Sequence, residues 1–133
     1  DSPATVVDVF LSVFDVHINR APVAGKVVET RYSKGQFLNA LRSAAGDVNE
    51  NNLIVIEAST GCNLAVRQIT GVIARRIVCA VSQGDSVAAG ERLGMIMFGS
   101  RTQVYIPLAA GFEPKVSIGQ RVKAGKTVLG YLR

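Results

Sequence analysis

Few side chains in this sequence are suited to acid-base or nucleophilic chemistry. His17 is the only histidine, and an imidazole with an ordinary pKa of about 6.5 can give and take a proton near neutral pH. A lone histidine between apolar segments more often has a structural role. Cys62 and Cys79 stand apart in no C-x-x-C pattern, which predicts two buried thiols in a reducing cytoplasm and no metal site or disulfide scaffold.

The pair Gly99-Ser100 lies between two apolar segments. Gly-Ser pairs usually mark turns, so residues 98–101 are predicted to form a turn between a strand that ends at Phe98 and one that begins at Gln103. Spacing alone gives this pair no chemical role.

Composition limits the classes of function. The chain has 133 residues, 48% of them hydrophobic and 19% charged, with a net charge of +5, which predicts one globular domain with anionic partners such as phospholipid surfaces. Nucleic acid is not expected, because there is no Trp, aromatic residues make up only 6% of the chain, and no DNA-binding motif is present. Apolar stretches such as residues 93–99 fall short of the roughly 18 residues of a membrane-spanning helix, and the N-terminus shows no targeting pattern.

The elements that must position these residues are short strands. Thirteen glycines separate segments rich in Val, Ile and Leu, which is typical of an all-β domain. The predicted strands are 5–13, 23–32, 53–58, 64–70, 72–81, 92–98, 103–107 and 127–132. Gly61-Cys62-Asn63 predicts a hairpin turn, and helical spacing of apolar residues predicts one short helix over 36–45.

An internal repeat is the strongest architectural signal. Residues 84–93 (GDSVAAGERL) return as 119–128 (GQRVKAGKTV), and both follow the pattern G-x-x-V-x-A-G-x-x-[LV]. The Gly and Ala-Gly positions allow tight turns and resemble those of lipoyl and biotinyl domains, as does the segment 21–28 (APVAGKVV). We therefore expect a barrel-sandwich hybrid built from two similar halves.

Five segments, in this order, resemble the short bacterial and archaeal phosphatidylserine decarboxylases. They are residues 14–22 (FDVHINRAP), 35–40 (GQFLNA), 49–52 (NENN), 68–79 (QITGVIARRIVC) and 90–101 (GERLGMIMFGSR). Each segment alone is a weak signal, but five in the right order over most of a short chain indicate the family.

The resemblance implies self-cleavage between Gly99 and Ser100. The Ser100 hydroxyl attacks the Gly99 carbonyl, to which a residue without Cβ gives access. Elimination from the resulting ester releases a chain that ends at Gly99, and the dehydroalanine left behind hydrates and loses ammonia to become a pyruvoyl group. This covalent cofactor, derived from Ser100, supplies the electrophilic carbonyl that decarboxylation of an amino acid requires. Phosphatidylserine would thus become phosphatidylethanolamine.

The same resemblance implies roles for other residues. His17 is the candidate proton donor, and Asp15 either orients a partner near the site or begins a turn. Arg75 and Arg76 are adjacent on a predicted strand and so point to opposite faces. One of them could pair bidentately with the lipid phosphate, and Arg20 is a further candidate for this task.

Two features depart from the family pattern. Longer members have a second histidine three positions after the first, where this sequence has Arg20, and nothing before Thr5 matches an upstream Pro-Ala-Asp-Gly segment beyond Pro3-Ala4. We therefore expect a single decarboxylase core over residues 1–133 without that upstream segment, which cleavage would divide into a β chain (1–99) and an α chain (100–133).

Other interpretations remain. One is a related decarboxylase of an archaetidyl lipid or a soluble amino acid, another is an uncleaved, inactive remnant, and a third is a non-catalytic lipoyl-like binding module. A carrier would need a lysine in an attachment motif, which this sequence lacks. For a decarboxylase we expect peripheral contact with the cytoplasmic face of the membrane through basic residues and an apolar rim. The cleaved chains would stay together, and self-association is left open.

Overall fold

The strands of this chain alternate buried and half-buried residues, which is the pattern that one covered sheet face produces. The computed structural model describes residues 4–11, 18–34, 49–59, 61–70, 77–96, 100–108, 111–117, 120 and 129–131. Its strands are β1 (Ala4–Leu11), β2 (Ile18–Arg20), β3 (Gly25–Ser33), β4 (Asn51–Ala58), β5 (Asn63–Ile69), β6 (Ile77–Cys79), β7 (Ser86–Val87), β8 (Arg92–Ile96), β9 (Ser100–Pro107), β10 (Glu113–Pro114) and β11 (Gly130–Tyr131).

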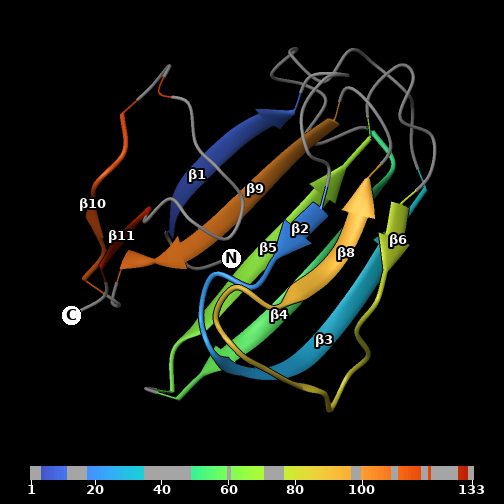
Figure 1. The fold of residues 1–133 in the computed structure, drawn as a ribbon, viewed down its shortest axis with the longest axis horizontal. Coiled ribbons are helices and arrows are strands. Elements are labelled where there is room, and N and C mark those ends of the chain that lie inside the picture. The colour runs from blue at the N-terminus through green and yellow to red at the C-terminus, as the bar shows by residue number, and fades with distance from the viewer. Residues whose placement is uncertain are drawn as a thin grey trace.

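The strands form three antiparallel sheets. A six-stranded sheet has the order β1-β9-β5-β4-β3-β7, a three-stranded sheet has the order β2-β8-β6, and β10 pairs with β11. The pairing of the edge strand β1 with β9 brings together distant parts of the sequence, since Asp8 faces Gln103, which lies 95 positions later. In Figure 1 the three-stranded sheet lies over β3, β4 and β5.

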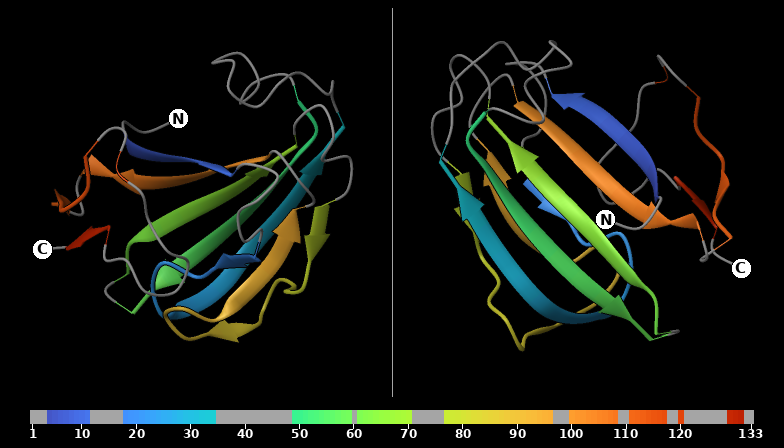
Figure 2. Two further views of the ribbon diagram at one scale, coloured as in Figure 1. Left: turned by 45° about the horizontal axis from the view of Figure 1, so that its top comes forward. Right: turned by 180° about the vertical axis from the view of Figure 1, so that it is seen from behind.

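The core fills the space between the two larger sheets. Ile54, Val66 and Val27 from the large sheet form one cluster with Leu93 of β8 and with Val81, and all five are buried. A second cluster, which contains Leu64, Val104 and Ile106, continues toward β10 and β11. The two layers are visible edge-on in Figure 2. This arrangement confirms the predicted all-β sandwich.

The predicted turns of the first repeat are confirmed. Gly84 and Gly90 have φ values of 100° and 82°, a conformation that glycine adopts without steric cost. Their N–H groups donate to the carbonyls of Val27 and Ala21, at 2.7 and 2.8 Å. These bonds attach the repeat to β3 and to the residue that follows β2.

The second repeat shows the same turn where it is described. In the first copy the Asp85 N–H donates to the Ser82 carbonyl, while the Asp85 carboxylate accepts from the Ser82 N–H at 2.9 Å. Gln120 and Ser117, 35 positions later, make the same reciprocal pair with both bonds at 3.1 Å. The sequence repeat is therefore also a structural one at this turn.

Two local predictions were wrong. Ser100 and Arg101 are not in a turn, because they pair with Leu11 and Phe10 as the first residues of β9; the ladder to β1 overrides the turn preference of Gly-Ser. Cys79 is exposed and Cys62 is half-buried, since Cys79 ends the edge strand β6 and Cys62 lies in the β4–β5 turn.

The remaining local predictions can be compared with the structure one by one. The hairpin at Gly61-Cys62-Asn63 is confirmed, since the Gly61 N–H donates to the Ala58 carbonyl at 2.8 Å. The predicted helix over 36–45 lies outside the described residues. Strands β2, β7 and β10 were not predicted, because two or three residues are too few to show a period of two. No helix within the described ranges is long and apolar enough to cross a bilayer.

Candidate functional site

Eight of the described strands begin or end at one end of the sandwich, which we call the Ser100 end. The strand termini there are Leu11, Ile18, Ser33, Asn51, Ile69, Ile77, Ile96 and Ser100. Register pairs connect them, because Leu11 faces Ser100 and Ile77 faces Ile96. Figure 1 shows these termini at the upper end of the sandwich. Both sheets therefore contribute to this end.

The candidate site residues predicted from the sequence adjoin these termini. His17 directly precedes β2, Gly99 directly precedes β9, and Arg76 directly precedes β6. These three residues, like Asp15 and Arg75, lie outside the described residues. The topology thus gathers the chain neighbours of the predicted residues at one end of the sandwich.

Ser100 itself opens the strand β9, which lies between β1 and β5 in the large sheet. Its backbone pairs with Leu11, and the next residue, Arg101, pairs with both Phe10 and Ile69. The Gly99-Ser100 peptide therefore lies where the chain enters a strand with a neighbour on each side, and β9 would keep both ladders if that peptide were broken.

Arg20 points to a different part of the fold. Its guanidinium donates to the Gly90 carbonyl at 3.0 Å, and the residue is exposed. Gly90 lies in the turn before β8, whereas residues 97–99 follow the other end of that strand. The structure does not bring the described Arg20 side chain to the Ser100 end.

A group of polar side chains lies between the sheets just inside the Ser100 end. We call Asn19, Asn52, Gln68 and Thr102 the polar cluster. Asn52 and Gln68 face each other across β4 and β5, and Gln68 and Thr102 face each other across β5 and β9, so the three share one row and one face of the large sheet. Asn19 comes from β2 in the other sheet. Gln68 is fully buried, and both asparagines are 5% exposed.

Hydrogen bonds run through the polar cluster from end to end. The Asn52 amide donates to Gln68 Oε1 at 2.9 Å, and Gln68 Nε2 donates to Asn19 Oδ1 at 2.9 Å. Asn19 Nδ2 then donates to Thr102 Oγ1 at 2.8 Å. A buried polar group without a partner costs about 1–3 kcal/mol, so these bonds make the cluster compatible with its place between the sheets.

A glycine and a backbone carbonyl fix the orientation of Gln68. Its Nε2 also donates to the Val78 carbonyl at 3.2 Å, and a carbonyl can only accept. Gly94 makes room for this contact, because a Cβ at position 94 would lie 2.0 Å from the Val78 carbonyl oxygen and 2.9 Å from Gln68 Nε2. The backbone of β6 and β8 therefore determines which way each amide of the polar cluster points.

The opposite face of the large sheet carries charge. The Nε of buried Arg101 lies 3.4 Å from a carboxylate oxygen of Asp8, and the Gln103 amide donates to the same carboxylate at 3.3 Å. The Arg67 guanidinium lies over the Tyr105 ring, 5.2 Å from its centroid. These contacts stabilise β9 against β1 and β5.

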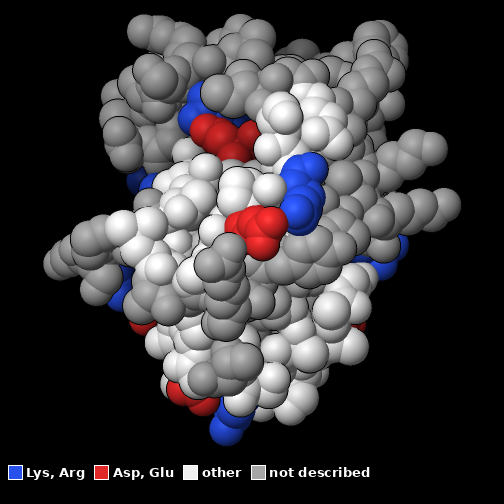
Figure 3. All heavy atoms as spheres, turned by 90° about the vertical axis from the view of Figure 1, so that its left-hand side faces the viewer, with Lys and Arg blue, Asp and Glu red and all other residues white. Residues whose placement is uncertain are grey.

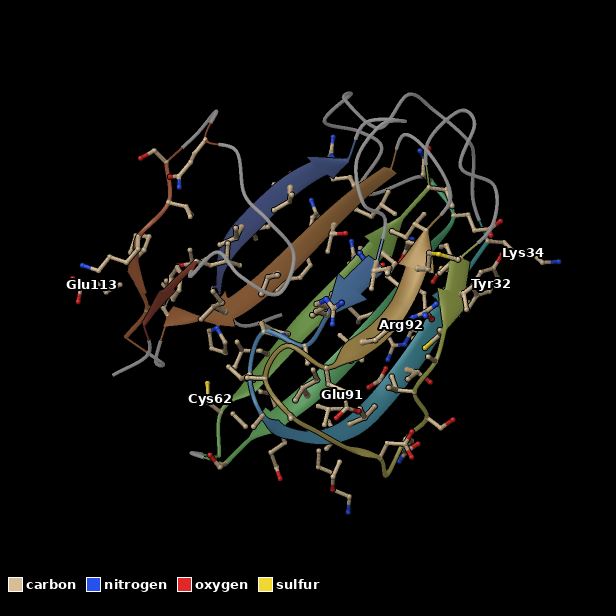
Figure 4. The ribbon with its side chains drawn as sticks, viewed as in Figure 1. Tyr32, Lys34, Cys62, Glu91, Arg92 and Glu113 are labelled. Carbon is tan, nitrogen blue, oxygen red and sulfur yellow. The ribbon has the colours of Figure 1, made fainter. Side chains whose placement is uncertain are left out.

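The Tyr32 hydroxyl is the group whose acidity the described surroundings change. A hydrogen bond to the Glu50 side chain raises the pKa of Tyr32, with smaller contributions from desolvation and from the charge of Glu50. Figure 4 shows Tyr32 and Lys34 at the end of β3, far from Cys62 in the hairpin. The raised pKa keeps this exposed phenol neutral over a wider range of pH.

Charge is mixed on the side of the molecule that carries β1, β10 and β11. Figure 3 shows acidic and basic side chains of the described residues interspersed over this face. An example is Lys115, whose Nζ lies 2.8 Å from the Glu113 carboxylate. Among the described residues, this face offers no continuous basic surface.

Sequence reasoning missed the polar cluster. A signal was present, because the inward positions of the predicted strand 64–70 are Leu64, Val66, Gln68 and Thr70. A change from apolar to polar residues on the buried face of a strand requires buried partners. The partner from β2 could not be inferred, since that strand was not predicted.

Comparisons with known proteins show the family of this chain. A family model described as phosphatidylserine decarboxylase matches residues 2–130. The chain is similar to the phosphatidylserine decarboxylase proenzymes of Novosphingobium aromaticivorans (52% identity over 97% of this chain and 50% of the relative) and Zymomonas mobilis (49% identity over 99% of this chain and 53% of the relative). The proenzyme of Ruegeria pomeroyi is 48% identical over all of this chain and 60% of its own length. The chain spans about half the length of the curated relatives it matches. It belongs to the phosphatidylserine decarboxylase family.

Proposed function

We propose that this chain forms the core of an enzyme that cleaves itself between Gly99 and Ser100 and converts phosphatidylserine to phosphatidylethanolamine. The observation that carries the proposal is the position of Ser100 as the first residue of β9, between β1 and β5, at the end where eight of the described strands begin or end. The relatives are named proenzymes, which supports a cleavage step.

The proposed self-cleavage starts with two groups of this chain and takes up one water. The Ser100 hydroxyl attacks the Gly99 carbonyl, so that a C–O bond forms as the C–N bond breaks and the proton moves to nitrogen. Elimination then releases residue 99 as a carboxylate, and hydration with loss of ammonia leaves a pyruvoyl group on residue 100. The two ladders of β9 hold the new chain end in place.

The surroundings of position 100 fit such a group. Alternate positions of a strand share a face, so position 100 falls on the face of β9 that carries Thr102 and the polar cluster. Beyond Thr102 the same face continues with buried Val104 and Ile106. A polar row next to the chain end would suit a small carbonyl group, which accepts hydrogen bonds.

The pyruvoyl group would supply the electrophilic carbonyl that accepts the electrons released by loss of carbon dioxide. Residues of the chain would transfer the proton and bind the substrate. His17, next to β2, would hold and deliver a proton, and Asp15 would orient a partner. Arg75 or Arg76, next to β6, would bind the lipid phosphate.

The lipid substrate also suggests where the protein works. A net charge of +5 supports peripheral contact with the cytoplasmic face of an anionic membrane. The fragments 1–99 and 100–133 would remain associated, because β9 is an internal strand of the large sheet.

Intact-protein mass spectrometry tests the proposal. Wild-type full-length protein should give two fragments that meet at Gly99-Ser100, and borohydride in the presence of phosphatidylserine should link the lipid amine to the fragment that begins at position 100. Ser100→Ala should stay one chain, keep its fold and be inactive. Ser86→Ala, at an exposed serine of β7, is the matched control and should cleave normally. An active Ser100→Ala protein would refute the proposal.

A further inference from the structure

We propose that the polar cluster is a positioning relay that sets the two sheets against each other at the cleavage site, with Thr102 as its last member. This inference rests on the proposed function. It assigns a role to Asn19, Gln68 and Thr102, none of which has chemistry of its own in the reaction above.

The Asn19–Thr102 hydrogen bond joins two strands next to the predicted reacting residues. Asn19 lies two positions after His17, and Thr102 lies two positions after Ser100. The 2.8 Å bond between them joins residues 83 positions apart in the sequence and in different sheets. It therefore fixes the strand that follows the predicted proton donor against the strand that begins at the predicted nucleophile.

Hydrogen bonds determine the orientation of each side-chain amide in the polar cluster. The Val78 carbonyl accepts from Gln68 Nε2, so Gln68 Oε1 must face Asn52 and accept from it. Asn19 consequently presents its oxygen to Gln68 and its nitrogen to Thr102. A buried network in which every amide has one orientation has one arrangement, and such networks specify geometry more sharply than apolar packing does.

The strand β2 is short and lies at the edge of its sheet, so its position depends on contacts made by its side chains. It has three residues and pairs only with β8. A bulge shifts its register between Asn19 and Arg20, and bulges redirect the chain around them. The side-chain bonds of Asn19 tie this short strand to the large sheet two positions after His17.

The hydroxyl proton of Thr102 is not used in the hydrogen bond with Asn19. Thr102 Oγ1 accepts from Asn19, and its own hydroxyl proton has no acceptor among the described residues. Because a hydroxyl is a donor as well as an acceptor, Thr102 could also donate toward a group at the Ser100 end. Its defined role in the relay is to accept from Asn19.

The relay predicts a specific pattern of self-cleavage rates. Thr102→Val keeps the shape of the side chain but removes the acceptor of Asn19, and it should slow cleavage by about 10- to 100-fold, as small misplacements of reacting groups do. Thr102→Ser restores the acceptor and should return the rate to within a few-fold of wild type. Asn19→Ala should slow cleavage like Thr102→Val, whereas Asn63→Ala, at an exposed asparagine in the hairpin, should not.

Val104→Ala separates positioning from loss of stability. Val104 is the next inward residue of β9 and is buried in the apolar core, so its truncation should lower the melting temperature at least as much as Thr102→Val does. It leaves the polar cluster intact and should cleave at nearly the wild-type rate.

The experiment follows the full-length protein by pulse-chase in cell-free translation, with melting temperatures measured on purified protein. Slow cleavage in Thr102→Val, normal cleavage in Val104→Ala and rescue by Thr102→Ser support the relay. Equal cleavage by Thr102→Val and wild type, or equal slowing in Val104→Ala, would overturn it while leaving the proposed function in place. A wild-type protein that never cleaves would overturn the proposed function and the relay together.

Discussion

Substitution of Gly94 by alanine should be among the most damaging single changes in the described part of the protein. A Cβ at this position would lie 2.0 Å from the Val78 carbonyl oxygen, and backbone atoms cannot move away as the end of a flexible side chain can. The same Cβ would lie 2.9 Å from Gln68 Nε2. One methyl group would therefore disturb both the β6–β8 ladder and the centre of the polar cluster.

The expected loss of stability can be worked from these contacts. Overpacking in a well-packed interior costs about 1–3 kcal/mol, and each weakened hydrogen bond adds about 1 kcal/mol. With one ladder bond and one Gln68 bond affected, the total is about 3–5 kcal/mol. Domains are typically stable by only about 5–15 kcal/mol, so a fall in melting temperature of about 10 °C or more should follow.

The assay is urea unfolding followed by circular dichroism, in a Ser100→Ala background that keeps the chain in one piece. Gly61→Ala is the control, because Gly61 has a φ of 86° but no atom would lie within 4 Å of a Cβ added there. It should cost only about 1–2 kcal/mol of conformational strain. A Gly94→Ala protein as stable as Gly61→Ala would refute the argument from close approach.

Three further predictions concern the site and the sheet. His17→Ala should keep the circular dichroism spectrum of the fold but lose carbon dioxide release from phosphatidylserine; an active variant would remove His17 from the proposed mechanism. Glu50→Gln should lower the pKa of Tyr32 toward its ordinary value, seen as an earlier rise of phenolate absorbance on titration. Since the folded-state pKa is raised, the stabilisation from this hydrogen bond should be complete below about pH 10 and disappear as pH rises through the raised pKa, with Tyr32→Phe showing no such loss. The cleaved fragments should elute together in gel filtration and separate only in strong denaturant, because Val104 and Ile106 of the second fragment are buried against Leu64 of the first; fragments that separate in buffer would contradict this.

The sequence allowed the architecture to be predicted because its signals are local. Alternating apolar residues in 53–58 and 64–70 and the turn residues Gly61-Cys62-Asn63 were enough to predict a hairpin, and the repeat predicted the turns at Gly84 and Gly90. The order of the strands was not predictable in this way. Nothing local indicates that β9 lies between β1 and β5, since that order depends on contacts between residues far apart in the chain.

The candidate site was predictable only in part for the same reason. The family segments identified Ser100 and His17, yet propensity placed Ser100 in a turn, because Gly-Ser pairs favour turns when no ladder competes. The polar cluster depends on a three-residue strand and on the absence of a side chain at Gly94. Neither feature has a periodic signature in the sequence.

The position of β9 would also decide when the proposed cleavage can happen. Its pairing with β1 closes a loop of most of the chain, as the 95 residues between Asp8 and Gln103 show, and such long-range ladders are slow to form. The peptide before Ser100 therefore reaches its final surroundings only after the large sheet is complete. Chain scission would then report that folding has finished, and a protein that misfolds would remain a single chain without a cofactor.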